Sequence, residues 1–289
     1  RHYPTALFHY FLPESYILGM TVALVARHKG PRVMSRRSLN YYQQKHVILG
    51  WLERFLHAFF PTLLANSRRV MADLIEKEKV PPSKVHLIYN GISVPHKPAQ
   101  GSPILTFIHV ANLIPYKGHK DLIQALGLIR HALPHEWRLW CVGQDTKNLQ
   151  QDLEVLCDTL ALKDHIHFLG ARHDVETLWA QAHIGFLPSH EEGFSNAILE
   201  GMAAGLPMIV TDVGGNSDAV VHGITGLVVP PHDPAALGAA IIALLDPVKQ
   251  RTMGKAGRQR ILDHFTLEAC VAAYDTLYTH LLKEKSCAA

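Results

Sequence analysis

The chain has 289 residues, of which 48% are hydrophobic and 18% are charged, and its formal net charge is +3. This balance is typical of a globular enzyme and excludes an intrinsically disordered chain. The length allows one large domain or two domains of ordinary size.

Membrane-spanning and secreted classes are not favoured by the sequence. The longest apolar run, residues 47–65, is interrupted by Glu53, Arg54 and Pro61, so it does not predict a membrane span. The start shows no secretory signal pattern. The four cysteines form no CxxC pair and no zinc-binding spacing. We therefore expect a reduced, cytoplasmic protein.

Charge is distributed unevenly along the chain. Residues 1–97 carry 14 Lys and Arg against 5 Asp and Glu, whereas residues 98–289 carry 14 against 20. The basic first part has two interpretations: contact with an anionic membrane or phosphorylated acceptor, or an ordinary basic surface. Nucleic-acid binding is not predicted, because the basic residues are not interleaved with aromatic residues on one recognisable element.

Short apolar runs alternate with helical patterns. The runs predict buried parallel strands at 62–66, 85–89, 104–110, 138–143, 166–170, 183–188 and 207–211. The helical patterns cover roughly 67–79, with Ser67 as N-cap, and 119–132, 147–161, 174–182, 195–204 and 234–245. This alternation predicts an α/β fold with parallel sheets covered on both faces.

A break in the pattern falls at residues 90–103, which are rich in proline, glycine and serine and lack apolar periodicity. It coincides with the change in charge sign. We therefore expect two α/β domains, 1–97 and 98–289, that face each other across a cleft. The last helix, about 266–283, is a candidate to pack back on the first domain.

The segment 191–215 carries the most chemistry. Glu192 lies in a predicted loop after a strand, and Glu200 lies in the helix that begins at Ser195. The free N–H groups and positive dipole end of this helix suit a diphosphate, and Gly193 allows close backbone approach. Each carboxylate can accept a pair of hydroxyl hydrogens, as a ribose and a hexose present them.

A glycosidase acid and nucleophile is the alternative interpretation of the two glutamates. In a continuous helix, eight residues span about 12 Å, whereas glycosidase carboxylates lie roughly 5–9.5 Å apart. The loop position of Glu192 blurs this comparison, so the spacing only weakens the glycosidase hypothesis.

The stretch EGFSNAILEGMAAGLPMIVTDVGG resembles the E-x7-E signature of retaining nucleotide-sugar glycosyltransferases of family 4. Further similar stretches are ANSRRV (65–70), VHLIYNGI (85–92), VANLIPYKGHKDLIQA (110–125) and HGITGLVVPPHDPAAL (222–237). The resemblance implies a GT-B fold: two Rossmann-like parallel-sheet domains facing a cleft. It also implies an N-terminal domain that is incomplete at its start, because no opening strand and glycine-bearing loop match the family.

The resemblance further implies roles for individual residues. Glu200 would hold the ribose hydroxyls, Glu192 would contact hydroxyls of the donor sugar near the reacting carbon, and Lys117 would neutralise the departing diphosphate. The other donor-binding positions that it implies are Gly193, Phe194, Ser195, Asn196, Asn112, Arg172, Gly214 and Gly215. Asn112 stands where the family often has an arginine.

The acceptor side departs from the family. PRVMSRRSL (31–39) occupies the place where many members carry a histidine, and Arg36 and Arg37 stand there instead. We hypothesise that one of them holds a phosphate. A surface arginine pair is the alternative.

Together these features predict a retaining hexosyltransferase that uses a nucleotide-sugar donor, expected to be a UDP-sugar, and a glycan or lipid-linked acceptor. Its expected setting is the synthesis of cell-surface polysaccharide or glycoconjugates. No cofactor and no metal are expected, since Lys117 and a helix dipole can carry the leaving-group charge. A GT-B sugar epimerase and a non-catalytic nucleotide-sugar-binding module remain as alternatives.

Residues 47–60 mix large apolar side chains with basic ones, among them Trp51, Phe55, Phe59 and Arg54. This pattern predicts either a core-facing helix or a helix that lies on an anionic bilayer. In the second case the protein would lie peripherally at the inner face of the membrane.

Overall fold

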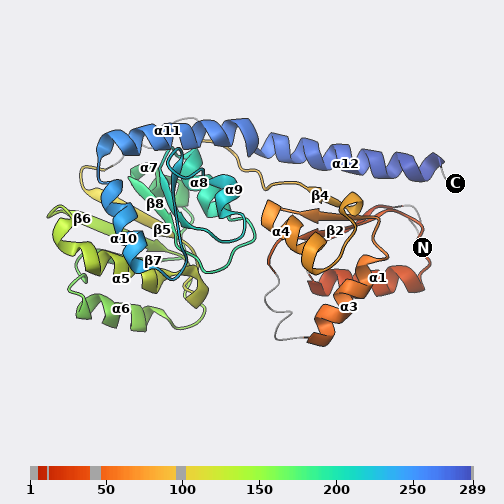
Figure 1. The fold of residues 1–289 in the computed structure, drawn as a ribbon, viewed down its shortest axis with the longest axis horizontal. Helices are drawn as coiled ribbons and strands as arrows, with labels where there is room; N and C mark the ends of the chain where they lie inside the picture. The colour runs from red at the N-terminus through yellow and green to blue at the C-terminus, as the bar shows by residue number, and fades with distance from the viewer. Residues whose placement is uncertain (1–5, 12, 40–46, 96–101, 288–289) are drawn as a thin grey trace. The chain divides into compact units, whose positions relative to one another are not determined.

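The computed structural model describes residues 6–11, 13–39, 47–95 and 102–287. The chain divides into two compact units, which are described separately (Figure 1). Unit 1 comprises Arg1–Gly91 and Leu267–Ala289, and unit 2 comprises Ile92–Thr266. The division therefore falls at Gly91 rather than at residue 97, and the last helix belongs to unit 1.

Unit 1 contains a parallel sheet of four strands in the order β1 (Phe8–Tyr10), β2 (Arg32–Arg36), β3 (Thr62–Ala65) and β4 (Val85–Leu87). The predictions of β3 and β4 are confirmed. The strands β1 and β2 were not predicted. The sequence of β2, RVMSR, is too polar to appear as a buried apolar run.

Helices cover both faces of this sheet. On one side lie α1 (Pro13–Val25), α3 (Val47–His57) and α4 (Arg68–Ala72), which continues into the π-helical turn η1 (Asp73–Lys77). On the other side lies α12 (Leu267–Cys287), as Figure 1 shows. Neighbouring strand residues point to opposite faces: Met34 and Leu63 pack with α1 and α3, whereas Val33 and Leu64 pack with α12.

Unit 2 contains a parallel sheet of six strands in the order β10-β9-β8-β5-β6-β7. The strands are β5 (Leu105–Val110), β6 (Trp137–Val142), β7 (Ile166–Gly170), β8 (Ile184–Leu187), β9 (Met208–Thr211) and β10 (Gly226–Val229). All except β10 were predicted. From β5 the chain adds strands in one direction and then, at β8, in the other, so the two strands flank a topological switch point.

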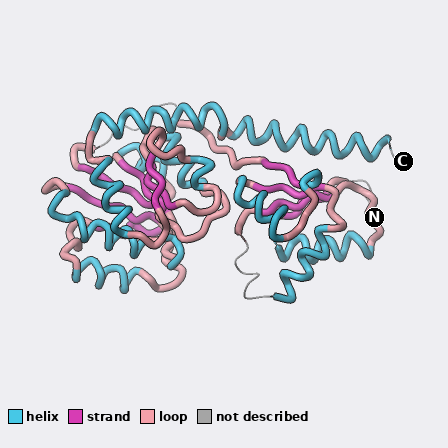
Figure 2. Tube along the Cα trace, viewed as in Figure 1, coloured by secondary structure: helices cyan, strands magenta, loops and turns pink. Residues whose placement is uncertain are grey.

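Helices also cover both faces of the second sheet (Figures 1 and 2). The main core of unit 2 lies between the sheet and α5 (His119–Ile129), α6 (Gln150–Thr159) and α10 (Pro234–Ala243). The opposite side carries α7 (Val175–Gln181), α8 (Asn196–Ala203) and α11 (Pro247–His264). The short helix α9 (Asn216–Ala219) follows β9.

The predicted helix starts agree with the structure to within a few residues, and Ser67 caps α4 by accepting a hydrogen bond from Val70 N at 3.2 Å. The helices α1, α9 and α11 were not predicted. Within the described ranges, no helix is both long enough and apolar enough to cross a membrane.

Candidate active site

The candidate site lies at the carboxyl ends of the strands of unit 2. The loop after β5 carries Lys117, and the loop after β8 carries Glu192. Because β5 and β8 are neighbours at the switch point, these two loops border the crevice where open parallel sheets bind their ligands. The topology thus explains why residues 75 positions apart meet.

Close packing fixes the loop after β8 against the loop after β5. Gly118 has φ +75°, a conformation that L-residues with side chains rarely adopt, and a Cβ there would collide with the carbonyl of Pro188. His190 N also donates to the carbonyl of Tyr116 at 2.7 Å. The backbone beside Lys117 is therefore held directly against the loop of Glu192.

The loop after β9 holds the same segment from the other side. Gly214 has φ +54°, and a Cβ there would collide with the carbonyl of Glu192. Gly215 N donates to Gly193 O at 2.8 Å, and the hydroxyl of Thr211 donates to Ser189 O at 2.5 Å. Gly214 and Gly215 thus shape the loop that carries Glu192.

Lys117 and Glu192 form a largely buried ion pair. Lys117 Nζ lies 2.5 Å from Glu192 Oε1, and the two side chains are 17% and 9% exposed. The hydroxyl of Ser189 donates to the same carboxylate oxygen at 2.9 Å. The sequence pointed to both residues as ligand contacts, but it gave no sign that they bind each other.

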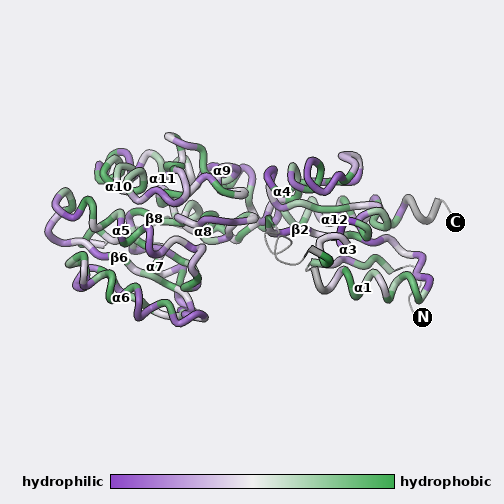
Figure 3. The backbone as a smooth tube through the Cα atoms, turned by 60° about the horizontal axis from the view of Figure 1, so that its bottom comes forward, coloured by the Kyte–Doolittle hydropathy of each residue, from purple (hydrophilic) through white to green (hydrophobic). Residues whose placement is uncertain are grey.

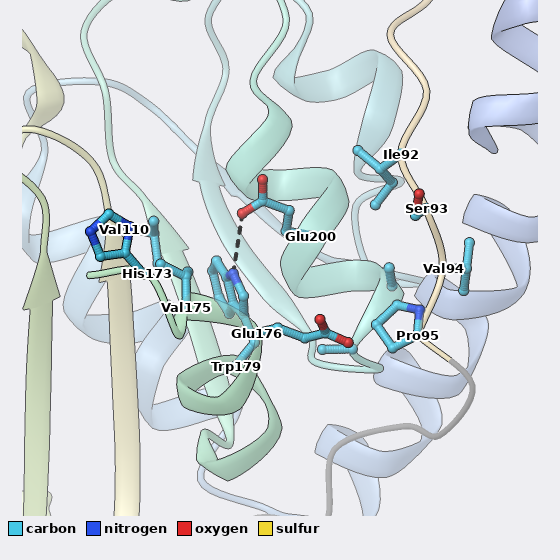
Figure 4. A pocket seen from close by; sticks show the side chains of 12 residues that line it. Ile92, Ser93, Val94, Pro95, Val110, His173, Val175, Glu176, Trp179 and Glu200 are labelled. Carbon is cyan, nitrogen blue, oxygen red and sulfur yellow. Dashed lines mark hydrogen bonds between the residues drawn. The ribbon is translucent and has the colours of Figure 1, made fainter. Parts of the chain in front are cut away.

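Glu200 lies in a neighbouring cavity of about 640 Å³, drawn in Figure 4. Trp179 Nε1 donates to Glu200 Oε2 at 3.3 Å. Burial raises the pKa of Glu200 above its ordinary value, and the hydrogen bond from Trp179 partly opposes this shift. Other lining residues are Ile92–Pro95, Val110, His173, Val175, Glu176, Ala203 and Ala204.

A second cavity of about 460 Å³ adjoins the first, because Val110 and Val175 line both. Asn112, Lys117 and Arg172 line it. Asn112 Oδ1 accepts a hydrogen bond from Gln144 N at 3.0 Å. The Arg172 guanidinium donates two hydrogen bonds, of 2.8 and 2.7 Å, to the Asp174 carboxylate. The positive charge of Arg172 is therefore balanced at the rim of the cavity.

The N-terminus of α8 has the form expected for an anion site. The helix begins at Asn196, and Ser195 precedes it in an extended conformation without a side-chain capping bond. Phe194 is only 6% exposed and packs against Phe265 with ring centroids 5.6 Å apart. Phe194 can therefore contribute to a binding site only through its backbone.

Two buried histidines lie beneath Lys117. His109 on β5 and His119 at the start of α5 have ring centroids 4.2 Å apart. Burial lowers the pKa of His119 to about 4, although a hydrogen bond with the backbone of Ala111 opposes the shift. Burial, and then the neighbouring His119 and Lys117, hold the pKa of His109 well below its ordinary value. Both rings are neutral at neutral pH and add no positive charge to the site.

The two arginines predicted for the acceptor side, Arg36 and Arg37, differ in burial and in charge pairing. Arg36 is buried and pairs with Glu78 at 2.8 Å and Glu53 at 3.5 Å. This geometry does not support the hypothesis that Arg36 holds a phosphate, because its charge is balanced inside unit 1. Arg37 is exposed and donates to Asn90 Oδ1 at 3.1 Å, so it alone of the two remains accessible.

Sequence reasoning missed several residues of the first cavity. Trp179 and Glu176 lie on α7, and a single tryptophan in an amphipathic helix is typical of a core residue. Ile92–Pro95 were interpreted as part of a linker, yet they line the cavity. The only available signal was the short apolar sequence ISVP within an otherwise polar break.

Comparison with known proteins agrees with this fold. Residues 4–95 match the model of Glycosyltransferase Family 4, and residues 104–247 match the model of Glycosyl transferases group 1. Together the two matches account for most of the chain. The two parallel-sheet α/β domains form the GT-B fold, and the chain carries both of these glycosyltransferase domains.

One curated relative is N-acetyl-alpha-D-glucosaminyl L-malate synthase of Bacillus anthracis, 31% identical over 178 residues, 61% of this chain and 46% of the relative. The chain spans about half the length of the curated relatives that it matches first.

Among solved structures, sucrose-phosphate synthase from Thermosynechococcus elongatus superposes with a TM-score of 0.85 at 24% identity, over 96% of this chain and 74% of that one. Anabaena HepE in complex with UDP-glucose superposes with a TM-score of 0.82 at 22% identity, over 94% and 78%.

Proposed function

We propose that the protein is a retaining hexosyltransferase that transfers a sugar from a nucleoside diphosphate donor to an acceptor hydroxyl. The observation that carries this proposal is the Lys117–Glu192 ion pair at the switch point of unit 2, beside the uncapped N-terminus of α8. A cation, the backbone N–H groups of a helix N-terminus and two carboxylates suit the phosphates and hydroxyls of such a donor.

Glu200 binds the nucleoside in this proposal. As a carboxylate it accepts hydrogen bonds from two neighbouring hydroxyls of the ribose, and Trp179 orients it from the other side. The cavity around it holds mainly apolar and aromatic groups next to a few polar ones, which is the usual composition of a nucleotide pocket.

Lys117 changes partner when the donor binds. A diphosphate carries more negative charge than one carboxylate, so it displaces Glu192 from Lys117, and Glu192 then accepts hydroxyl hydrogens of the sugar. As the bond to the sugar breaks, negative charge grows on the leaving phosphate, and Lys117 and the N–H groups of α8 stabilise that charge. Gly193, Ser195 and Asn196 supply the backbone at this helix end.

The relatives support a UDP-sugar as the donor, since HepE was solved in complex with UDP-glucose. Two further curated relatives are named as a glycogen synthase of Mycobacterium tuberculosis and a capsular polysaccharide biosynthesis glycosyltransferase of Staphylococcus aureus. We propose a related role in polysaccharide or glycoconjugate synthesis, with a glycan or lipid-linked acceptor. They favour neither the epimerase nor the binding-module alternative.

The experiment is a transfer assay with UDP-hexoses and a panel of glycan and lipid-linked acceptors. We expect UDP release together with a glycosylated product whose anomeric configuration, read by NMR, is that of the donor. Lys117→Ala is expected to reduce the rate by at least about a hundredfold, and the exposed neighbour Lys120 serves as control in Lys120→Ala.

Each of the other outcomes would contradict part of the proposal or indicate a different function. An inverted product would contradict retention. Interconversion of the donor sugar without transfer would identify an epimerase. UDP-sugar binding without turnover over the whole panel would identify a binding module. A Lys120→Ala loss equal to that of Lys117→Ala would contradict the role of Lys117.

We also propose that unit 1 contacts an anionic membrane at the cytoplasmic side. On α3, Ile48, Trp51 and Phe55 are 88%, 74% and 62% exposed, and α1 presents Leu18, Val22 and Val25. Figure 3 shows hydrophobic stretches along these helices. Arg54 on α3 and Arg27 after α1 add positive charge, as membrane-surface helices require.

Cosedimentation with vesicles of phosphatidylglycerol tests this contact. We expect binding at low salt that falls in Trp51→Ser/Phe55→Ser and at high salt. No binding of the unaltered protein at low salt would contradict it. The three described thiols, Cys141, Cys157 and Cys270, are free, in keeping with the cytoplasmic side of a membrane.

A further inference from the structure

A cluster of three metal-ligating side chains lies beside the candidate site but takes no part in the proposed reaction. Asp121, His190 and His232 each present one ligand atom, and these atoms lie within 4.8 Å of one another. Asp121 is in the first turn of α5, His190 precedes α8, and His232 precedes α10. Three separate segments therefore converge on one point.

Two contacts already hold this cluster together. His190 Nε2 lies 2.9 Å from Asp121 Oδ2, and the rings of His190 and His232 lie with centroids 3.7 Å apart at a tilt of 36°. The packing of α10 against α5 brings His232 toward Asp121. In the part of the chain that the structure describes, neither ring nitrogen of His232 has a hydrogen-bond partner.

The backbone of His232 gives an independent indication of function. Its φ is +59°, one of the few non-glycine residues of the described chain with positive φ. This conformation costs free energy for a residue with a side chain and is concentrated at ligand-binding sites. Here the strain directs an exposed imidazole back onto a second imidazole and a carboxylate.

We propose that Asp121, His190 and His232 bind one divalent transition-metal ion of the zinc class. Two imidazoles and one carboxylate are ligands that suit Zn²⁺ and do not suit Mg²⁺ or Ca²⁺. Tetrahedral Zn²⁺ places such ligand atoms about 3.3 Å apart. Asp121 and His190 are already near that separation, and the exposed side chain of His232, whose ligand atom lies within 4.8 Å of theirs, closes the site by a small movement.

The bound ion fixes the position of the loop that carries Glu192. His190 lies two residues before Glu192, and its backbone N–H is bound to Tyr116, next to Lys117. A metal that joins His190 to α5 and to the segment before α10 therefore holds this loop in place. The ion does not contact the diphosphate, and its binding does not depend on sugar transfer by the protein.

The test is a Zn²⁺ titration of the full chain, purified without a histidine tag. Calorimetry measures the binding, and thermal unfolding measures its effect on stability. Co²⁺ serves as a spectroscopic substitute, because tetrahedral Co²⁺ has strong visible absorption bands. We expect one equivalent of Zn²⁺ to bind and to raise the melting temperature.

The variants keep the fold while removing ligands. His190→Gln retains a donor for Asp121, and His232→Asn retains a residue that tolerates positive φ. Each is expected to weaken Zn²⁺ binding by at least about tenfold and to abolish the rise in melting temperature. The exposed His135, replaced in His135→Gln, is the matched control and should change neither.

Circular dichroism and the melting temperature without metal establish that each variant is folded. Absence of saturable Zn²⁺ binding to the unaltered chain would overturn the proposal. Binding that His190→Gln and His232→Asn leave unchanged would also overturn it, because the ion would then lie elsewhere on the molecule.

Discussion

At the scale of single residues, charged side chains of the candidate site form ion pairs with each other. A largely buried ion pair such as Lys117–Glu192 loses much hydration and contributes little net stability. It keeps the lysine close to the end of α8 without leaving a buried charge unpaired. The sequence predicted that both residues matter, but not their pairing, because the contact depends on which strands are neighbours.

The raised pKa of Glu200 leads to a prediction about pH. In the proposed function the ribose binds the ionised carboxylate of Glu200, so UDP affinity should be full above the pKa of Glu200 and should fall as pH decreases through it. We expect calorimetry from neutral pH to about pH 5 to show this fall beyond that of Glu200→Gln. Protonation of UDP itself affects both proteins equally. Equal slopes for the two would contradict the assignment.

The raised pKa of Glu200 has the opposite effect on the folding stability, which decreases as pH rises. A folded-state pKa above the unfolded value means that ionising Glu200 costs folding free energy, so its contribution falls as pH rises through the raised pKa. Glu200→Gln removes this cost. We therefore expect it to melt no lower than the unaltered protein at neutral pH.

Gly214 offers a matched test of loop geometry. Gly214→Ala places a methyl group against the carbonyl of Glu192 at φ +54°, whereas Gly223→Ala meets open space at φ +76°. Both carry the backbone strain, of roughly 1–3 kcal/mol. We expect Gly214→Ala alone to lower affinity for the UDP-sugar, by about tenfold or more, because only it displaces Glu192. Equal losses in both variants would show that strain, not position, is responsible.

At the scale of elements, apolar runs predicted β3 to β9 and missed β1, β2 and β10. β2 contains Arg36, which is buried because Glu53 and Glu78 neutralise it and His57 donates to Glu78 at 2.6 Å. The sequence of the strand does not reveal a salt-bridge partner that lies far away in the chain. β10, GLVV, is short and follows a glycine-rich turn, so its apolar run is too brief to stand out.

The cluster around Arg36 should hold unit 1 together. Burial alone would raise the pKa of Glu78, but the hydrogen bond from His57 and the charge of Arg36 hold it below its ordinary value. Arg36→Met leaves two buried carboxylates without their cation, so we expect a loss of roughly 3–5 kcal/mol in unfolding free energy. Arg37→Met, at an exposed position, should change stability by no more than about 0.5 kcal/mol.

Thermal and denaturant unfolding of the two arginine variants measure this difference. Because Glu78 has a lowered pKa, its stabilising contribution is present above the unfolded-state value and is lost as pH falls through the folded-state value. The gap between Arg36→Met and the unaltered protein should therefore narrow in acid. A gap that is absent at neutral pH would contradict the structural role of Arg36.

At the scale of the whole molecule, the sequence predicted the α/β class and singled out residues 191–215, but it did not predict how the candidate site is assembled. Lys117, Glu192 and Gly214 meet because β5, β8 and β9 are neighbours in the sheet. The return of α12 to unit 1 likewise depends on its packing with Val33 and Leu64, which are far from it in the sequence.

The measurement that tests the central claim most directly is calorimetric titration of the chain with UDP, with GDP and ADP for comparison. We predict one bound nucleotide per chain, binding that is lost in Glu200→Ala, and unchanged binding in the exposed control Glu136→Ala. Binding of none of the three nucleotides, or binding that survives Glu200→Ala, would contradict the assignment of this crevice as a nucleotide-sugar site.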